Sequence, residues 1–259
     1  MVRLIGVALD ITERKAIEIQ QERLSQLKDD FLSTVSHELR SPLASIRMAI
    51  EMLELAFEQI VPMPGASSFA QPERLQQYLG ILHEQCDQEL ELVNNLLDLQ
   101  RLEAERTEVN IVSIPIIDWV SNIAGTFEGR MQERQQHLQV VLPPDLPPFN
   151  SDLDILTSVL RELLTNACKY TPPGESITVS ICSDPAHLQL RVSNSGVQIA
   201  PVELERIFDK FYRIPGGDRW KQGGTGLGLA LVKKQVEYLG GTMGVESNES
   251  GLHFVINLQ

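Results

Sequence analysis

One long amphipathic pattern near the N-terminus limits the possible folds more than any other feature of this chain. From about residue 12 to residue 57, apolar residues recur at steps of three and four, which is typical of one long helix with a buried stripe. The stripe consists of Leu24, Leu27, Phe31, Val35, Leu39, Leu43, Ile46, Ile50, Leu53 and Phe57. A helix of this length needs tertiary partners, which predicts a coiled coil or a bundle.

A second helix follows the stretch VPMPGASSFAQP, which is rich in Pro, Gly and Ser. Its stripe consists of Leu75, Leu79, Leu82, Cys86, Val93 and Leu97. Further apolar residues widen this stripe towards the C-terminal end, at Leu92, Leu96, Leu99 and Leu102. One partner helix cannot cover so wide a surface, whereas two hairpins can. The sequence therefore predicts an α-helical hairpin that forms a dimeric four-helix bundle.

After about Thr107 the pattern changes to short strands and helices. Period-two alternation or short apolar runs predict five strands, at HLQVVL, ITVSIC, LQLRVS, GTMGVES and LHFVINL. Helical periodicity predicts helices at residues 115–129, 152–169 and 226–239. The order is neither a strict βαβ repeat nor all-β. We therefore expect an α/β sandwich, in which helices pack on one face of a mixed sheet.

Composition excludes several classes of function. The chain has 259 residues, 42% of them hydrophobic, which is enough to bury a core. Its net charge of −13 argues against nucleic acid or an anionic membrane as a partner, because both need a basic face. Three scattered cysteines without C-x-x-C spacing predict neither a disulfide framework nor a zinc site, and favour a reduced, cytoplasmic compartment. No apolar run approaches the ~18 residues that span a bilayer, although a region missing at the N-terminus could attach the full-length protein to a membrane.

His37 stands in the stretch SHELRSPL, next to Glu38 and five residues before Pro42. It lies about 200° around the helix from both Val35 and Leu39, so position alone predicts a solvated surface histidine. An exposed neutral imidazole is also a competent nucleophile, and Glu38 can take its ring proton or fix its tautomer. Pro42 removes the helical partner of the Glu38 carbonyl, which predicts a bend after the histidine.

The stretch ELLTNACKYTPPG carries Glu162 and Asn166 on one helix face. An Asn that faces a pocket can coordinate a hard cation through its carbonyl oxygen, and Lys169, one turn further on, can meet a phosphate. Taken alone, an Asn on an amphipathic helix is usually just solvated.

Two glycine-containing segments follow. VSNSGVQIAP is a strand that ends at Gly196, which predicts either an ordinary turn or a place where the backbone approaches a ligand. GGTGLGLALVKK places glycines at 223, 224, 226 and 228 in a loop that opens a helix, which predicts a phosphate cradle. No Lys-Ser/Thr pair follows and no βαβ unit surrounds it, so it is neither a Walker loop nor a dinucleotide fingerprint.

Four of these segments, in order, resemble the sensor histidine kinases of two-component signalling. SHELRSPL resembles the H box of that family, ELLTNACKYTP its N box, IFDKFYR its F box and GGTGLGLALV its second glycine box. The run VEYLGGTMGVESNESGLHFVINL is similar to its closing strands, so the resemblance covers nearly everything from Leu27 onward. The opening GVALDITERK resembles the exit strand and linker of a PAS sensor domain, which fits an alternating strand that has no partner.

The resemblance implies four parts. Residues 1–10 would be the last strand of a PAS-like domain, 11–27 a coiled-coil signalling linker, 28–107 the dimerisation and histidine phosphotransfer hairpin, and 108–259 the catalytic ATP-binding domain. That last domain would share its α/β sandwich with the ATPases of type II topoisomerases and mismatch repair.

The resemblance also implies roles for single residues. His37 would be the phosphoacceptor, Glu38 its activating base, and Ser41 a hydroxyl that positions water for dephosphorylating the partner, where the family often has Thr. Asn166 would hold Mg²⁺, with Glu162 as a weaker candidate. The nucleotide pocket would be formed by Asn166, Lys169, Tyr170, Asn194, Gly196, Arg213, Gly224, Thr225, Gly226, Leu227 and Gly228.

One box departs from the family pattern. The first glycine box is usually Asp-x-Gly-x-Gly, whereas this chain has Asn194 and Gln198 at its first and last positions. The usual Asp accepts a hydrogen bond from the adenine amino group, which the Asn194 carbonyl oxygen can also accept, although without the charge. We expect weaker ATP binding, by about 1 kcal/mol. Gln198 adds a side chain where a glycine gives the backbone freedom.

The expected function is ATP-dependent autophosphorylation on His37 and phosphotransfer to an aspartate of a response regulator receiver domain, with ATP and Mg²⁺ as cofactors. Because Ser41 keeps a hydroxyl group, phosphatase activity towards the regulator is also compatible with the sequence. An alternative is a degenerate kinase that acts mainly as a scaffold or phosphatase because its first glycine box is altered. A third alternative, an ATPase without histidine transfer, is disfavoured because it gives His37 and the dimer hairpin no purpose.

Overall fold

The computed structural model describes residues 39, 43–53, 72–103, 109–183, 187–214 and 225–259. The chain divides into two units, Met1–Glu89 and Leu90–Gln259. The predicted strand 1–10, the linker 11–27 and residues His37, Glu38, Ser41, Pro42 and Gly224 lie outside the described residues.

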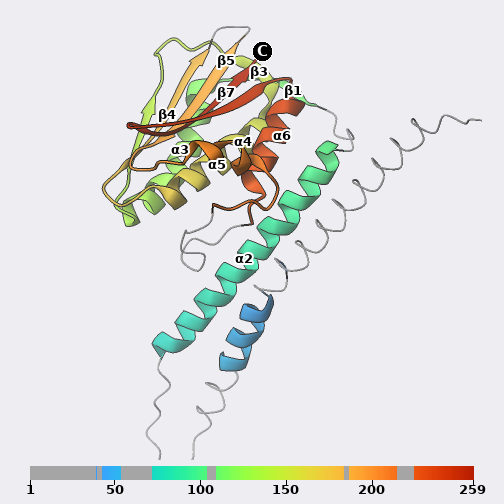
Figure 1. Cartoon of the computed structure of the whole chain (residues 1–259), viewed down its shortest axis with the longest axis vertical. Helices are drawn as coiled ribbons and strands as arrows, with labels where there is room; N and C mark the ends of the chain where they lie inside the picture. The colour runs from blue at the N-terminus through green and yellow to red at the C-terminus, as the bar shows by residue number, and fades with distance from the viewer. Residues whose placement is uncertain (1–38, 40–42, 54–71, 104–108, 184–186, 215–224) are drawn as a thin grey trace, which may run out of the picture. The chain divides into compact units, whose positions relative to one another are not determined.

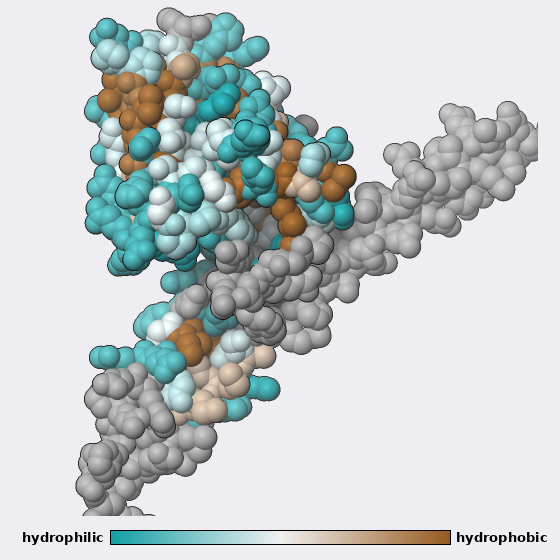
Figure 2. Space-filling model, turned by 60° about the vertical axis from the view of Figure 1, so that its left-hand side comes forward, coloured by the Kyte–Doolittle hydropathy of each residue, from teal (hydrophilic) through white to brown (hydrophobic). Residues whose placement is uncertain are grey.

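The region predicted to be a helical hairpin contains two described helical segments. Residues 43–53 are helical, and α2 (Pro72–Glu103) continues for 32 residues, which confirms the second predicted helix. Hydrophobic residues, brown and beige in Figure 2, lie among hydrophilic ones on these segments. In the described part of the chain, no helix has both the length and the apolar character needed to cross a membrane.

The main sheet has five strands, all of which were predicted from the sequence. Their order across the sheet is β2 (His137–Val141), β4 (Ser176–Ser183), β5 (Leu188–Asn194), β7 (Gly251–Leu258) and β6 (Thr242–Asn248). β2 runs parallel to β4, and every other neighbouring pair is antiparallel. The sheet is therefore mixed, as expected.

Three helices lie against one face of this sheet (Figure 1): α3 (Ile116–Glu133), α4 (Leu153–Tyr170) and α6 (Gly228–Tyr238). The strand pattern explains why one face is covered. On β5, Leu190 and Val192 are buried, whereas Gln189 and Arg191 point to the other face. α4 supplies the centre of the core, with Leu156, Val159, Leu160, Leu163 and Leu164 at most 1% exposed. The predicted sandwich is confirmed.

A second sheet, of two strands, was not predicted. β1 (Ile111–Ile114) pairs antiparallel with β3 (Phe149–Asp152), and each strand is too short for a period-two pattern to stand out. Asp152, which was predicted as the first residue of a helix, is instead the N-cap of α4. Its Oδ1 accepts hydrogen bonds from the backbone N–H groups of Asp154 and Ile155, both at 3.0 Å.

Two further short elements, α5 (Pro201–Leu204) and η1 (Arg206–Phe208), connect β5 to the segment that contains Arg213. They were not predicted because four and three residues are too few for a helical pattern to repeat. η1 contributes the buried Ile207 to the core, which holds this connection against α6.

Candidate functional site

The polar face of α4 carries the first part of the site. Its buried face, rich in leucine, packs into the core and thereby turns Glu162 and Asn166 to the opposite side. The two side chains are four residues apart, and Asn166 Nδ2 donates a hydrogen bond to Glu162 Oε1 at 3.2 Å. This bond leaves Oδ1 of Asn166 available to a cation.

Glu162 has an unusual environment for a carboxyl group. Burial raises its pKa to about 7, against the opposing influence of the Lys169 charge and the hydrogen bond from Asn166. A carboxyl group with such a raised pKa is frequent in functional sites.

The beginning of α6 lies directly against this carboxyl group. A Cβ atom at Gly228 would overlap the Glu162 carboxylate, so a larger residue here would have to displace that side chain. The N-cap residue, Leu227, makes no side-chain cap to α6, and its own N–H donates to Thr225 Oγ1 at 3.3 Å. The first N–H groups of α6 therefore have no side-chain acceptor among the described residues, which suits an anion.

The last turn of α4 adds positive charge. Lys169 Nζ lies 5.1 Å from the centroid of the Tyr170 ring. Burial lowers the pKa of Lys169, and the charge of Arg213 lowers it further. Burial raises the pKa of Tyr170, while Arg213 acts in the opposite direction. Arg213 is therefore close enough to the end of α4 for the two cations to repel each other, and an anion between them would relieve that repulsion.

Phe211 and Gly226 hold the Arg213 segment beside the start of α6. The Phe211 N–H donates to the Gly226 carbonyl oxygen at 2.9 Å. Gly226 has φ +69°, and a Cβ atom there would lie 2.8 Å from the Phe211 backbone. Phe211 itself has φ 64°, which is uncommon for a bulky residue. The close approach of the two backbones explains the glycine at 226.

The turn after β5 carries the other predicted pocket residues, Asn194 and Gly196. Asn194, the last residue of β5, is 2% exposed. Gly196 has φ +70°, and a Cβ atom there would lie 2.7 Å from the Glu175 side chain. This confirms the predicted glycine turn at the end of a strand.

Several residues that hold this turn were missed by the sequence analysis. Ser195 Oγ donates to Glu175 Oε2 at 2.5 Å and accepts from the Ser176 N–H at 2.8 Å. Gly251 packs on the Asn194 carbonyl, where any side chain would collide. No local pattern marks Glu175, Ser176 and Gly251, because these residues are far from the turn in the sequence and reach it only through strand pairing.

Gln198 does not enter the site. Its side chain is exposed, and its Nε2 donates to the Asn248 carbonyl oxygen at 3.5 Å. The neighbouring Ile199 N–H donates to Ser247 Oγ at 2.9 Å. The residue that replaces the usual glycine thus helps to attach the turn to the β6–β7 hairpin.

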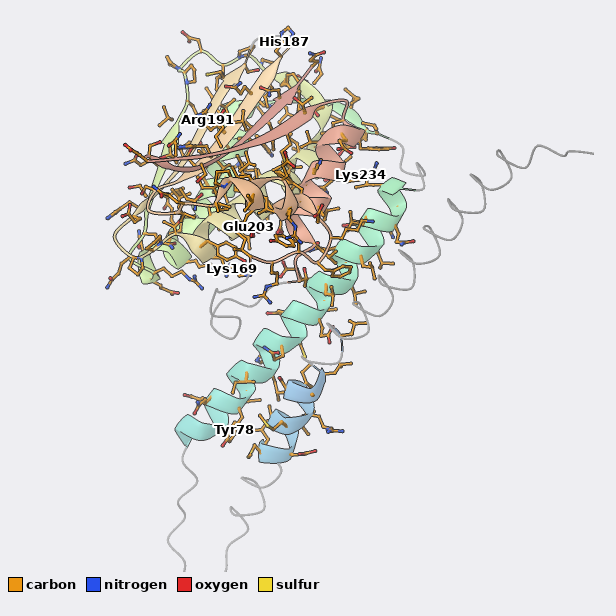
Figure 3. All side chains as sticks on the ribbon, viewed as in Figure 1. Tyr78, Lys169, His187, Arg191, Glu203 and Lys234 are labelled. Atoms are coloured by element: carbon orange, nitrogen blue, oxygen red, sulfur yellow. The ribbon has the colours of Figure 1, made fainter. Side chains whose placement is uncertain are left out.

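The structure brings most of the predicted pocket residues into two groups. Glu162, Asn166 and Gly228 touch at the junction of α4 and α6, and Lys169, Tyr170 and Arg213 influence one another electrostatically. Asn194 and Gly196 form the second group, and no hydrogen bond between described residues links it to Asn166. Figure 3 shows Lys169 at the end of this unit opposite His187.

The donor set around Glu162 suits one type of metal ion. Among the residues that the structure describes, no group of three or more His, Cys, Asp or Glu side chains could hold a metal ion. Mg²⁺, however, often takes only one or two protein oxygens and completes its shell with water and phosphate. The Glu162 carboxylate and the Asn166 amide oxygen fit that requirement.

Two family models match the chain. Residues 151–259 match the histidine kinase-, DNA gyrase B- and HSP90-like ATPase family, and residues 27–105 match the His Kinase A (phospho-acceptor) domain. The mixed sheet, the helices on one face and the site between β5, α4 and α6 all fall in or beside the first match.

Curated relatives extend this similarity over both regions. The chain is 33% identical over 251 residues to the sensor histidine kinase WalK of Bacillus subtilis, covering 95% of this chain and 38% of the relative. It is 31% identical over 247 residues to the circadian input-output histidine kinase CikA of Synechococcus elongatus, covering 91% and 31%. The chain thus spans about a third of the length of these relatives.

Solved structures share the fold. The histidine kinase AdeS of Acinetobacter baumannii has a TM-score of 0.65 at 21% identity, with 86% of this chain and 97% of that chain covered. Full-length ShkA, in complex with AMPPNP, has a TM-score of 0.62 at 23% identity, with 88% and 45% covered. The histidine kinase ThkA, in complex with the response regulator TrrA, has a TM-score of 0.63 at 18% identity, with 98% and 67% covered.

Fold and site together define a phospho-acceptor domain followed by an ATPase domain of the histidine kinase, gyrase and HSP90 type. The chain belongs to the sensor histidine kinases. The relatives give no support to the alternative of a degenerate kinase. A PAS-like domain at the N-terminus remains a prediction.

Proposed function

We propose that this chain is the kinase region of a sensor histidine kinase that phosphorylates His37 with ATP and passes the phosphoryl group to an aspartate of a response regulator. The contact between Glu162 and the uncapped start of α6, with Lys169 and Arg213 nearby, carries the proposal. It combines a carboxylate for a cation with helix N–H groups and cations for phosphates.

Each pocket residue has a role in this proposal. Asn166 and Glu162 hold Mg²⁺, which supplies neutralisation of the phosphate charge when it is bound. The α6 N-terminus, with Gly224, Thr225, Gly226, Leu227 and Gly228, surrounds the phosphates. Arg213 and Lys169 pair with phosphate oxygens, and Tyr170 lines the pocket. The adenine base binds at Asn194, beside the turn that contains Gly196.

The chain's own residues account for the transfer step. A ring nitrogen of His37 attacks the γ-phosphorus, the bond from that phosphorus to the bridging oxygen breaks, and ADP leaves. Glu38 accepts the proton from the other ring nitrogen, which prevents the ring from remaining cationic. In the second step the N–P bond breaks as an aspartate oxygen of the regulator attacks. Ser41 keeps a hydroxyl that can orient water for dephosphorylation of that aspartate.

The rest of the chain serves this chemistry. The helical region 28–107 forms a homodimer, because α2 leaves large apolar side chains exposed, and it offers the regulator a docking surface. Residues 108–259 form the catalytic domain, and residues 1–27 connect it to a PAS-like sensor. A cytoplasmic location fits a kinase that meets a response regulator.

Transfer of a labelled phosphoryl group tests the function directly. Incubation with γ-labelled ATP and Mg²⁺ should label the protein with an acid-labile, base-stable phosphate, and His37→Gln should abolish the label without changing nucleotide affinity. The matched control His83→Gln, on α2, should retain full labelling. Absence of label on the natural chain, with ATP binding intact, would contradict the proposed kinase.

A further inference from the structure

Tyr212 lies between the segment that carries Arg213 and the short elements α5 and η1. Its hydroxyl group donates a hydrogen bond to Oε2 of Glu203 on α5 (Figure 3). The guanidinium carbon of Arg206, on η1, lies 4.1 Å from the centroid of the Tyr212 ring, which is within the range of a cation–π contact. One side chain therefore contacts both short elements, α5 through its hydroxyl group and η1 through its ring.

The backbone of Tyr212 is attached to the same part of the molecule. Its N–H group donates a hydrogen bond to the Asp209 carbonyl oxygen at 3.1 Å. η1 is fixed to the core through Ile207, which is 8% exposed and belongs to the main hydrophobic cluster. The contacts of Tyr212 with α5 and η1 therefore connect the Arg213 segment to the core of the domain.

The hydroxyl group of Tyr212 is a lasting donor. Its hydrogen bond to Glu203 raises the pKa of Tyr212, because an ionised phenol would lose this bond and face a second negative charge. The hydroxyl group therefore stays protonated at neutral pH and keeps its bond to α5.

Arg213 follows Tyr212 directly in the chain and lies near the last turn of α4, where its charge acts on Lys169. An arginine side chain is long and has many rotamers, and the charge of Lys169 repels its guanidinium group when no anion is present. An anchor at the preceding residue limits how far that group can move, which lowers the cost of ordering it when a phosphate binds. We propose that Tyr212 is a positioning residue, which holds Arg213 beside Lys169 so that both cations can bind the phosphates. This inference rests on the proposed function.

Binding of Mg-ATP and of adenosine to the whole chain tests the proposal. Adenosine has the same base and sugar but no phosphates, so the ratio of the adenosine constant to the Mg-ATP constant measures the phosphate contacts. Both dissociation constants should be measured, by calorimetry or NMR titration, for the natural protein, Tyr212→Leu and Glu203→Ala. Glu205→Ala is the matched control for Glu203→Ala, because Glu205 is exposed, lies two residues further on and makes no side-chain cap.

We expect Tyr212→Leu to lower this ratio by about 10-fold, because a displaced arginine loses its charge-assisted bonds to phosphate. Glu203→Ala, which removes only the acceptor of the hydroxyl group, should lower it by about 3-fold, and Glu205→Ala should leave it unchanged. In a chain that also carries Arg213→Ala, Tyr212→Leu should cause no further loss, since its effect passes through Arg213. An equal loss in that chain, or an unchanged ratio in Tyr212→Leu, would overturn the inference while leaving the kinase intact.

A merely structural role for Tyr212 would weaken the binding of adenosine and Mg-ATP alike and leave their ratio unchanged, which also overturns the inference. Thermal unfolding shows whether Tyr212→Leu folds. If it does not, Glu203→Ala, measured with and without Arg213→Ala, decides the inference by the same comparison. Failure of the proposed function looks different, because the natural protein would then bind neither Mg-ATP nor adenosine, and the positioning role would fall with the nucleotide site.

Discussion

Gly228 illustrates how a single residue is determined by a contact that lies far away in the sequence. The second glycine box suggested a flexible loop that approaches phosphates, and the structure adds a steric reason for one of its glycines. The Glu162 carboxylate occupies the space where a Cβ atom would stand, although α4 and α6 are well separated in the chain.

Gly228→Ala should therefore displace the Glu162 side chain and weaken Mg-ATP binding, with only a small loss of stability because the end of that side chain can move. Gly125→Ala is the matched control, because Gly125 lies within α3 and a Cβ atom there meets nothing within 4 Å. That change should stabilise the protein by about 0.5–1 kcal/mol, since Ala favours helix over Gly. Urea unfolding and calorimetry measure both quantities. Equal ATP affinity in the two variants would refute the steric explanation.

Among the elements, α4 depends on Asp152 for its start. Asp152 Oδ1 caps two backbone N–H groups, and Oδ2 accepts the Asn110 N–H at 2.8 Å. The same side chain therefore holds the start of α4, which carries Asn166, and the residue just before β1. An Asp directly before an apolar periodic run is a recognisable helix-start signal, whereas its bond to Asn110 is not visible in any local pattern.

Asp152→Ala should lower the free energy of unfolding by about 1–2 kcal/mol, because it removes a helix cap and one further bond. Asp152→Asn, which keeps an acceptor oxygen, should lose less. Asp145→Ala, at an exposed loop position, should change stability by less than about 0.5 kcal/mol. Urea unfolding followed by circular dichroism compares the three. If Asp152→Ala behaved like Asp145→Ala, the cap would not contribute to stability.

For the whole molecule, the exposed apolar residues of α2 bear on assembly. Leu90, Val93 and Leu97 are 62%, 40% and 49% exposed. Their spacing of three and four residues places them on one face of the helix, where a second copy of the chain can cover them. Isolated apolar residues on a surface need no explanation, but a row of them on one helix face does.

Replacement of Leu90 and Leu97 by Glu should shift the protein from dimer to monomer, because two charges would then be buried at the interface. Gln100→Glu, which adds a charge at another exposed position of α2, should leave the dimer intact. Sedimentation velocity at several concentrations distinguishes the two species. A double variant that still sediments as a dimer would place the interface elsewhere.

The sequence by itself determined the local elements. Steps of three and four predicted α2, α3, α4 and α6, and period-two alternation predicted the five strands of the main sheet, because these periods repeat within a single element. The short strands β1 and β3 were not predicted, because four residues contain too few repeats of the alternation to be recognised. The ordered boxes, read as a resemblance, predicted the pocket residues before any geometry was known.

Only the tertiary structure decided which of those residues meet and what holds them. The contact of Glu162 with Gly228, the bond of Ser195 to Glu175 and the close approach of Gly251 to the Asn194 carbonyl all involve neighbours that are distant in the chain. Packing of α4 and α6 and the register of β4, β5 and β7 bring these neighbours together. A periodic pattern encodes which face of an element is buried, but contacts between elements depend on how those faces are packed.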